Sequence, residues 1–344
     1  MAHPARRCGE CHESHLTEWT GSSHAEADRS PVYQAMRAAA PDAAACDRCH
    51  APLAAVLGRA DPLAAEGVTC EVCHSIAAVE LADEPGAAAG WTLQLAGNRK
   101  YGPLCDVEEP YFHRAGCSPL HAASRLCAAC HHLTQPGAAG VALPVFSEFA
   151  EWQHGEAMSA GLQCQGCHMP KSGGTVASGG PRRVGVSQHG DVVAAGDALK
   201  VEAAVLARAG GLEVAGRVRV SGVAHGLPAG VPGRELALVC ELVDGTGRIL
   251  ASDEVTYGRV LVDDGGREVP FFAARRVGAD TRLHPGDARA FTLRLPAPPE
   301  GGAVVLRLLD RPISPSLARA LAIAPPAARE LSQRRFTGPW QAAP

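Results

Sequence analysis

The second half of the chain shows a regular alternation of apolar and polar positions. The alternating segments are residues 198–206, 212–220, 235–243, 248–257, 267–273, 287–295 and 302–309. A period of two is typical of strands that bury one face, and turns such as Asp244-Gly-Thr-Gly separate the segments. About seven short strands at this spacing predict an antiparallel β-sandwich of Ig-like size.

The first 170 residues have no such period and no long amphipathic stretch. Short segments interrupted by Pro and Gly predict helices near residues 22–39, 51–57, 121–131 and 147–160. Aromatic residues make up only 4% of the chain, so side chains alone supply little apolar surface for a core in this half. This half therefore needs another source of apolar surface or of covalent cross-links.

A glycine-rich run separates the two patterns. Residues 171–180, Lys-Ser-Gly-Gly-Thr-Val-Ala-Ser-Gly-Gly, are typical of a linker. We therefore expect an α+β chain with a mainly helical and loop domain at residues 1–180 and a β-sandwich domain at residues 181–325. The Pro- and Arg-containing residues 326–344 are expected to form a surface tail.

Ten of the 13 cysteines belong to five copies of a Cys-x-x-Cys-His motif. The five motifs consist of Cys8, Cys11 and His12; Cys46, Cys49 and His50; Cys70, Cys73 and His74; Cys127, Cys130 and His131; and Cys164, Cys167 and His168. Two thiols at this spacing can form thioethers with the two vinyl groups of one porphyrin, and the adjoining imidazole can then bind the iron as its proximal ligand. The motifs predict five covalently attached c-type haems, whose packing would organise the first domain.

Zinc sites, disulfides and redox dithiols are the alternatives for a Cys-x-x-Cys pair. Zinc fingers place a His pair further along the chain, with spacing such as C-x₂-C…H-x₃₋₅-H. A redox dithiol would come with a thioredoxin-like βαβ pattern and would not recur five times. The His that directly follows every second Cys favours haem.

A low-spin haem needs a second strong iron ligand, and ten further histidines are available. Methionine is scarce, and Met169 adjoins His168, so it cannot reach the opposite face of the same haem. Bis-His ligation is therefore favoured. The candidate distal ligands are His24, which we expect on a helix, His113 and His189, followed by His121, His132 and His154, whereas His3, His15 and His284 are interpreted as surface residues.

Three cysteines lie outside the motifs. Cys105 and Cys117 are predicted to form a disulfide, as expected for an exported protein. Cys240 lies in an apolar run and is predicted to be a buried thiol.

Several residues around the motifs form a recognisable order. They are Glu18-Trp19-x₃-Ser23-His24-Ala25 after the first motif, Ala51-Pro52 after the second, Glu66-Gly67-Val68 before the third, and Met169-Pro170 after the fifth. In this order, over roughly residues 8–190, the chain resembles multihaem cytochromes related to the tetrahaem electron acceptor of ammonia oxidisers and to hydroxylamine-oxidoreductase-like proteins. The resemblance implies stacked and perpendicular haem pairs, with His24 as a distal ligand.

The second half resembles a β-domain that is appended to such cytochromes. The residues that carry this resemblance are 224–230, Ala-His-Gly-Leu-Pro-Ala-Gly. It makes His225 a candidate for a haem or interdomain contact.

Electron transfer is the favoured function, because the supply of histidines exceeds the demand for ligands. The alternative is a multihaem oxidoreductase that acts on a small nitrogen or sulfur compound at one five-coordinate haem. Related nitrite reductases carry a Cys-x-x-Cys-Lys motif, which does not occur here, and nothing marks a tyrosine for cross-linking to a haem. We therefore favour a carrier over an enzyme.

The distribution of charge along the chain indicates which kind of partner the protein binds. Residues 1–180 contain 11 Lys and Arg against 19 Asp and Glu, a net charge of -8, whereas residues 181–344 contain 21 against 17, a net charge of +4. The acidic first half favours basic redox partner proteins, including other multihaem cytochromes. The net charge of -4 for the whole chain argues against a nucleic-acid partner.

Two observations bear on location. No apolar run is long enough for a membrane-spanning helix. Residues 1–12 lack the apolar core of a signal peptide, although haem attachment normally follows export. We expect that a leader is absent from this sequence and that the protein is periplasmic or extracellular.

Overall fold

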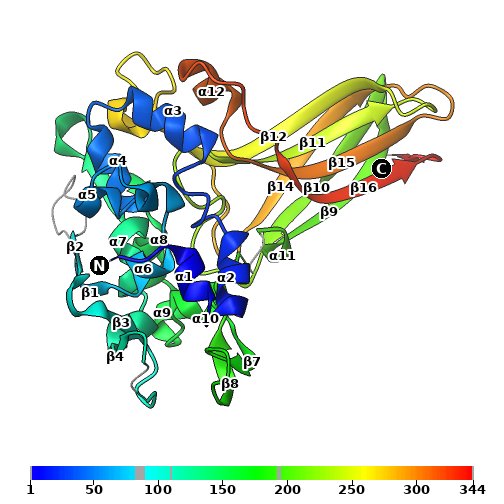
Figure 1. Ribbon diagram of the computed structural model, residues 1–344. Coiled ribbons are helices and arrows are strands. Elements are labelled where there is room, and N and C mark those ends of the chain that lie inside the picture. Colours follow the sequence, from blue (N-terminus) through cyan, green and yellow to red (C-terminus); the bar gives the residue numbers. More distant parts are fainter. Residues whose placement is uncertain (1, 82–89, 109–110, 192–194, 343–344) are drawn as a thin grey trace. The chain divides into compact units, whose positions relative to one another are not determined.

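The computed structural model describes residues 2–81, 90–108, 111–191 and 195–342 and mixes helices with several sheets (Figure 1). The chain divides into two compact units, Met1–Val193 and Ala194–Pro344. None of the described helices is long and apolar enough to cross a membrane.

Short helices dominate the first unit. They are α1 (Ala5–Gly9), α2 (Glu13–Thr20), α3 (Pro31–Ala39), α4 (Ala43–His50), α5 (Ala54–Leu57), α6 (Cys70–Cys73), α7 (Arg125–His131), α8 (Glu148–Gln153), α9 (Glu156–Ser159) and α10 (Cys164–His168), with 3₁₀ turns at Pro62–Glu66, Ala96–Asn98, Pro119–Ala122 and Ala138–Gly140. Helices this short are marginal by themselves, so end caps matter. Ser30, Asp42 and Thr69 cap α3, α4 and α6 by accepting backbone N–H groups.

Four strand pairs accompany these helices. They are β1 (Ile76–Glu80) with β2 (Gly90–Leu93), β3 (Arg99–Gly102) with β4 (Arg114–Cys117), β5 (Leu133–Pro136) with β6 (Ala142–Phe146), and β7 (Lys171–Thr175) with β8 (Arg182–Ser187). Only the β3–β4 pair is parallel. Strands of four to six residues are too short to show a clear period of two, which is why the sequence did not predict them.

The glycine-rich run is not a linker, in contrast to our expectation. Lys171–Thr175 forms β7, which pairs with β8 through backbone hydrogen bonds that do not depend on side chains. The first unit therefore continues to Val193 instead of ending at residue 180.

Two sheets build the second unit. The strands are β9 (Leu199–Arg208), β10 (Gly211–Val220), β11 (Glu235–Val243), β12 (Ile249–Val262), β13 (Arg276–Asp280), β14 (Ala288–Pro296), β15 (Ala303–Arg311), β16 (Arg329–Thr337) and β17 (Gln341–Ala342), with helices α11 (Ala195–Ala198) and α12 (Pro315–Ala320) and a 3₁₀ turn at Phe271–Ala273. One sheet has the order β14-β10-β9-β17 and the other β13-β12-β11-β15-β16. All pairings are antiparallel except that of β17 with β9.

Side chains from both sheets fill a common core in the second unit. Val214 of β10, Leu238 of β11 and Val304 of β15 are fully buried in it. Cys240 is also fully buried, which confirms its prediction as a core thiol. Buried and exposed residues alternate along β14, whereas β11 has buried residues on both of its faces.

Two segments of the second unit differ from the prediction. Residues 267–273 contain the Phe271–Ala273 turn instead of a strand, because Pro270 lacks an N–H group for a sheet ladder. Residues expected in a surface tail form β16, which pairs with β15 at the edge of the five-stranded sheet. Most side chains of β16 are exposed, so its sequence lacks the alternation that marks a half-buried strand.

A fragment of residues 195–344 is expected to fold without haem, because its core is made by its own two sheets. Expressed in a cytoplasm that does not attach haem, it should give a β-type circular dichroism spectrum and a cooperative thermal transition. A fragment that ends at residue 325 lacks β16 and should melt at a lower temperature. An unfolded 195–344 fragment would contradict this prediction.

Candidate haem centres

Each Cys-x-x-Cys-His motif lies in a short helix or at its end. Cys46 and Cys49 belong to α4, and the third, fourth and fifth motifs have both cysteines in α6, α7 and α10. Helical residues three apart lie on one face, so the two thiols of a motif point the same way. All ten motif cysteines are free thiols, whereas Cys105 and Cys117 form the predicted disulfide.

Three of the five histidines in these motifs are held by a backbone carbonyl. The contacts of Nδ1 with the carbonyl oxygen are His12 to Val176 at 2.6 Å, His50 to Ala27 at 3.1 Å and His74 to Tyr101 at 2.6 Å. A ring that donates its Nδ1–H leaves the lone pair of Nε2 for a metal. These histidines are thus oriented as iron ligands would be.

Burial keeps these imidazoles neutral, which is the form that binds a metal. Desolvation lowers the pKa of His74 to about 4, and it also lowers the pKa of His50. The candidate distal ligand His24 has a lowered pKa, first from burial and then from the neighbouring His131. Burial likewise lowers the pKa of His189 to about 4.

Three of the candidate distal histidines face a motif histidine. Two imidazoles that bind one metal from opposite sides, at a metal–nitrogen distance of about 2.0 Å as in zinc–histidine bonds, place their ring centroids roughly 6 Å apart. The observed centroid distances are 6.3 Å for His24 and His131, 6.3 Å for His113 and His12, and 6.2 Å for His189 and His74.

The lower-ranked candidates have different surroundings. The ring of His121 lies 5.9 Å from that of His74, but its Nε2 is 2.9 Å from the Cys73 carbonyl oxygen, and Cys73 belongs to the same motif as His74. Its buried Nδ1 has no hydrogen bond within the part of the chain that the structure describes. His154 donates from Nδ1 to the Ala150 carbonyl in its own helix, and His132 packs on Phe149.

His24 does not lie on a helix, in contrast to our expectation. It lies in the turns between α2 and α3, where its carbonyl accepts the Val68 N–H at 3.0 Å. Gly67, at φ +73°, allows this close approach, because a Cβ there would lie 2.6 Å from the His24 oxygen. The segment before the third motif therefore fixes the position of His24.

His15 is not a surface residue, which corrects the interpretation of the sequence. Its side chain is only 16% exposed and its ring lies 4.5 Å from that of His189. His15 is placed one helical turn after His12, on the face of α2 that meets residues 187–191, and this spacing of three could have revealed it.

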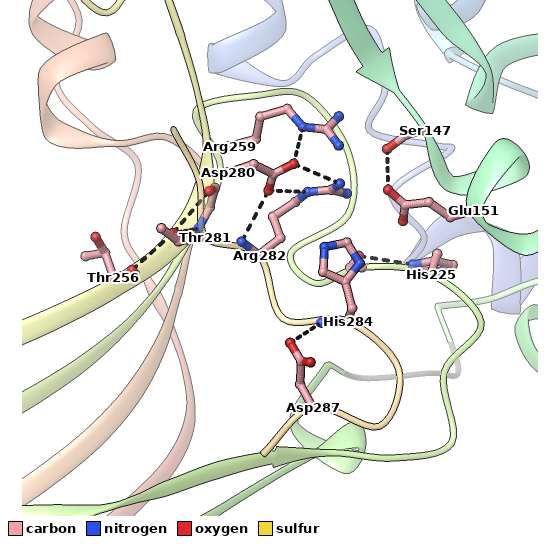
Figure 2. Close-up of polar contacts among 12 residues, drawn as sticks. Ser147, Glu151, His225, Thr256, Arg259, Asp280, Thr281, Arg282, His284 and Asp287 are labelled. Carbon is pink, nitrogen blue, oxygen red and sulfur yellow. Dashed lines mark hydrogen bonds and ion pairs between the residues drawn. The ribbon is translucent and has the colours of Figure 1, made fainter. Parts of the chain in front are cut away.

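The histidines of the second unit lie on loops without any attachment motif. The backbone N–H of His284 donates to the carboxylate of Asp287 at 2.9 Å (Figure 2). Nδ1 of His225 lies 3.2 Å from the Gly226 carbonyl oxygen. Asp280 joins the guanidinium groups of Arg259 and Arg282 nearby. Burial alone would raise the pKa of Asp280, but the two arginines outweigh it and lower the pKa.

The five motifs are close neighbours within the first unit. The thiol of Cys70 lies beside that of Cys8, that of Cys130 beside that of Cys49, and that of Cys127 beside that of Cys164. Cys73 lies near both Cys127 and Cys130. Helix packing agrees, since α1 contacts α6 and α4 contacts α7.

The apolar surface of the first unit fits a large apolar cofactor. Its main core cluster is small, with Leu53, Val72, Ile76, Val79 and Ala129 as the buried members. Most of the large apolar side chains that are exposed among the described residues belong to this unit: Val56, Leu57, Val107, Tyr111, Phe112, Val141, Met158, Leu162 and Val184. Free thiols, neutral imidazoles and uncovered apolar surface together match what c-type haem requires.

Two comparisons show that the chain is similar to multihaem cytochromes, one over a short segment and one in fold. Residues 7–75 match the family model described as cytochrome c554 and c-prime. The whole chain is similar in fold to a penta-heme cytochrome c552 from Thermochromatium tepidum, with 21% identity, a TM-score of 0.71, and coverage of 97% of this chain and 98% of that one. No curated protein matches the chain. The comparisons therefore show a fold shared with a penta-heme cytochrome and a family match over residues 7–75.

Proposed function

We propose that this chain is an electron-transfer protein with five covalently attached c-type haems, most of them with bis-His iron ligation. The observation that carries the proposal is the set of adjoining motifs in the first unit, where a thiol of one motif lies beside a thiol of another. Haems attached there would lie within electron-transfer range of one another. When bound, they supply one-electron iron chemistry, and the protein orients them and tunes their potentials.

The contacts suggest which histidine serves which iron. His12, His50, His74, His131 and His168 are the proximal ligands in this proposal. The distal ligands are His113 for the first motif, His189 for the third and His24 for the fourth, as the centroid distances near 6 Å support. His121, with its unbonded Nδ1, and His154 are the candidates for the remaining irons.

The same contacts suggest an order for electron transfer. The first motif adjoins the third through Cys8 and Cys70, and the third adjoins the fourth through Cys73. The fourth motif also adjoins the second and the fifth. In this arrangement the haem of the fourth motif is a branch point.

We further propose that the similarity of this chain to multihaem cytochromes extends to the electron acceptors of ammonia oxidisers.

Partners and location follow from charge and cysteine chemistry. The net charge of -8 over residues 1–180 favours basic redox partner proteins, including other multihaem cytochromes. The Cys105–Cys117 disulfide is typical of an oxidising compartment, which supports a periplasmic or extracellular location. For the second unit, the orders β14-β10-β9 and β12-β11-β15-β16 support an Ig-like sandwich.

One observation favours the alternative function, an oxidoreductase acting on a small nitrogen or sulfur compound at a five-coordinate haem. Among the described residues, the ring contact of His50 is with Tyr33, at 4.1 Å, and not with a second histidine. The Tyr33 hydroxyl donates to the buried Asp47 at 2.7 Å. Counting high-spin haems in the oxidised protein separates the two functions, since a carrier with full bis-His ligation has none.

Denaturing mass spectrometry is expected to show the polypeptide heavier by five haem groups. The reason is that each motif supplies two free thiols for thioether bonds. Thioethers survive denaturation, whereas zinc or non-covalent haem would be lost. A smaller whole number of haems in fully matured protein would contradict the proposal.

A further inference from the structure

Glu18, in α2, reaches the segment that follows β8 and carries His189. Its Oε2 accepts the backbone N–H of His189 at 2.8 Å and lies 3.8 Å from Nδ1 of the same residue. The same oxygen lies 3.9 Å from Nδ1 of His15. One carboxylate therefore faces two imidazoles whose rings are 4.5 Å apart.

The contact between Glu18 and His189 is partly shielded from solvent, and the segment that carries His189 is held at a second point. The side chains of His189 and Glu18 are 23% and 32% exposed, and the buried Nδ1 of His189 has no hydrogen bond among the described residues. A second carboxylate, Asp191, accepts the backbone N–H and the hydroxyl of Ser23 at 2.8 and 2.6 Å. Residues 189–191 are thus attached to the α2 region at two independent points.

We propose that Glu18 is a positioning residue that holds His189 in place as the ligand opposite His74 and lowers the reduction potential of that iron. The inference rests on the proposed function, because it requires His189 to be an iron ligand. The ring of His189 lies 6.2 Å from that of His74, and its Nδ1 lies 3.8 Å from the Glu18 carboxylate.

Two physical effects connect Glu18 to the iron. A carboxylate that faces the free nitrogen of a ligating imidazole orients the ring and raises its basicity. A fixed negative charge near the iron also stabilises the ferric state, which carries one more positive charge than the ferrous state. Both effects act in the same direction, so Glu18 should lower the potential of the haem of the third motif.

The test uses the full-length protein with its haems and compares four variants. E18Q keeps an oxygen that can accept the His189 N–H but removes the charge, whereas E18A removes both. E26Q is the matched control, because Glu26 is an exposed carboxylate that pairs with Arg29. D191A removes the second anchor of the segment and leaves Glu18 in place.

We expect E18Q to keep five low-spin haems and to raise one of the five reduction potentials. E18A should raise the same potential and convert part of one haem to the high-spin form, because His189 is no longer held. E26Q should change neither, and D191A should leave the potential lower than E18Q does. Potentiometric titration and low-temperature electron paramagnetic resonance measure both properties.

The variant H189A separates this inference from the proposed function. If H189A leaves every haem low-spin, His189 is not an iron ligand, and the proposed role of Glu18 is then also wrong. If H189A produces a high-spin haem while E18Q and E18A leave potentials and spin states unchanged, only the role of Glu18 is overturned. Stoichiometric non-haem metal that E18A loses would also overturn it, since His15, Glu18 and His189 would then be ligands of a separate metal ion.

Discussion

Replacing Cys70 and Cys73 with Ala is expected to give a protein with four haems and a markedly less stable first unit. Val72 and Ile76, within and just after this motif, belong to the core cluster of the unit. Cys70 adjoins the first motif and Cys73 adjoins the fourth, so the missing porphyrin leaves a hole between neighbours. The free energy of unfolding of the first unit should fall by at least about 3–5 kcal/mol, which is the range for truncating a buried Phe or Trp to Ala.

The fifth motif provides a matched control for this experiment. Cys167 is exposed, and no residue of α10 is buried. Replacing Cys164 and Cys167 with Ala should also remove one haem but should lower the melting temperature of the first unit less. Mass spectrometry gives the haem count, and thermal unfolding followed at the haem absorbance gives the stability. Equal destabilisation by the two double substitutions would contradict a central position for the third motif.

His24→Ala is expected to convert one low-spin haem to the high-spin form and to shift one reduction potential, while all five haems stay attached. The ring of His24 lies 6.3 Å from that of His131, and losing its imidazole would leave that iron without its second strong ligand. Coordination competes with protonation, so the iron bond should persist well below the usual His pKa of about 6.5. Absorption and electron paramagnetic resonance spectra of the oxidised protein measure the spin state.

The control for this substitution is His284→Ala. His284 lies on a loop of the second unit, where its backbone bonds Asp287, and its replacement should change neither spin state nor potential. An unaltered low-spin spectrum for His24→Ala would show that the assignment is wrong. The iron bound by His131 would then have a distal ligand other than His24.

The sequence by itself predicted the parts of this protein that depend on local spacing. Two thiols and an imidazole within five residues specify haem attachment wherever the helix lies, so Cys8 to His12 could be interpreted without a fold. Alternation likewise predicted β10 and β14, since each of these strands buries alternate residues. Cys105 and Cys117 could be paired because they are close in sequence and outside the motifs.

Only the tertiary structure decided which histidines face one another. His189 meets His74 and His15 because the β7–β8 hairpin, which the sequence suggested was a linker, returns the chain to α2. Such pairings join residues that are far apart in the chain, and no local pattern records them. The edge strand β16 was missed for a related reason, since its pairing with β15 uses backbone groups that every residue carries. Local chemistry can therefore be read from the sequence, whereas the ligand pairs depend on long-range contacts.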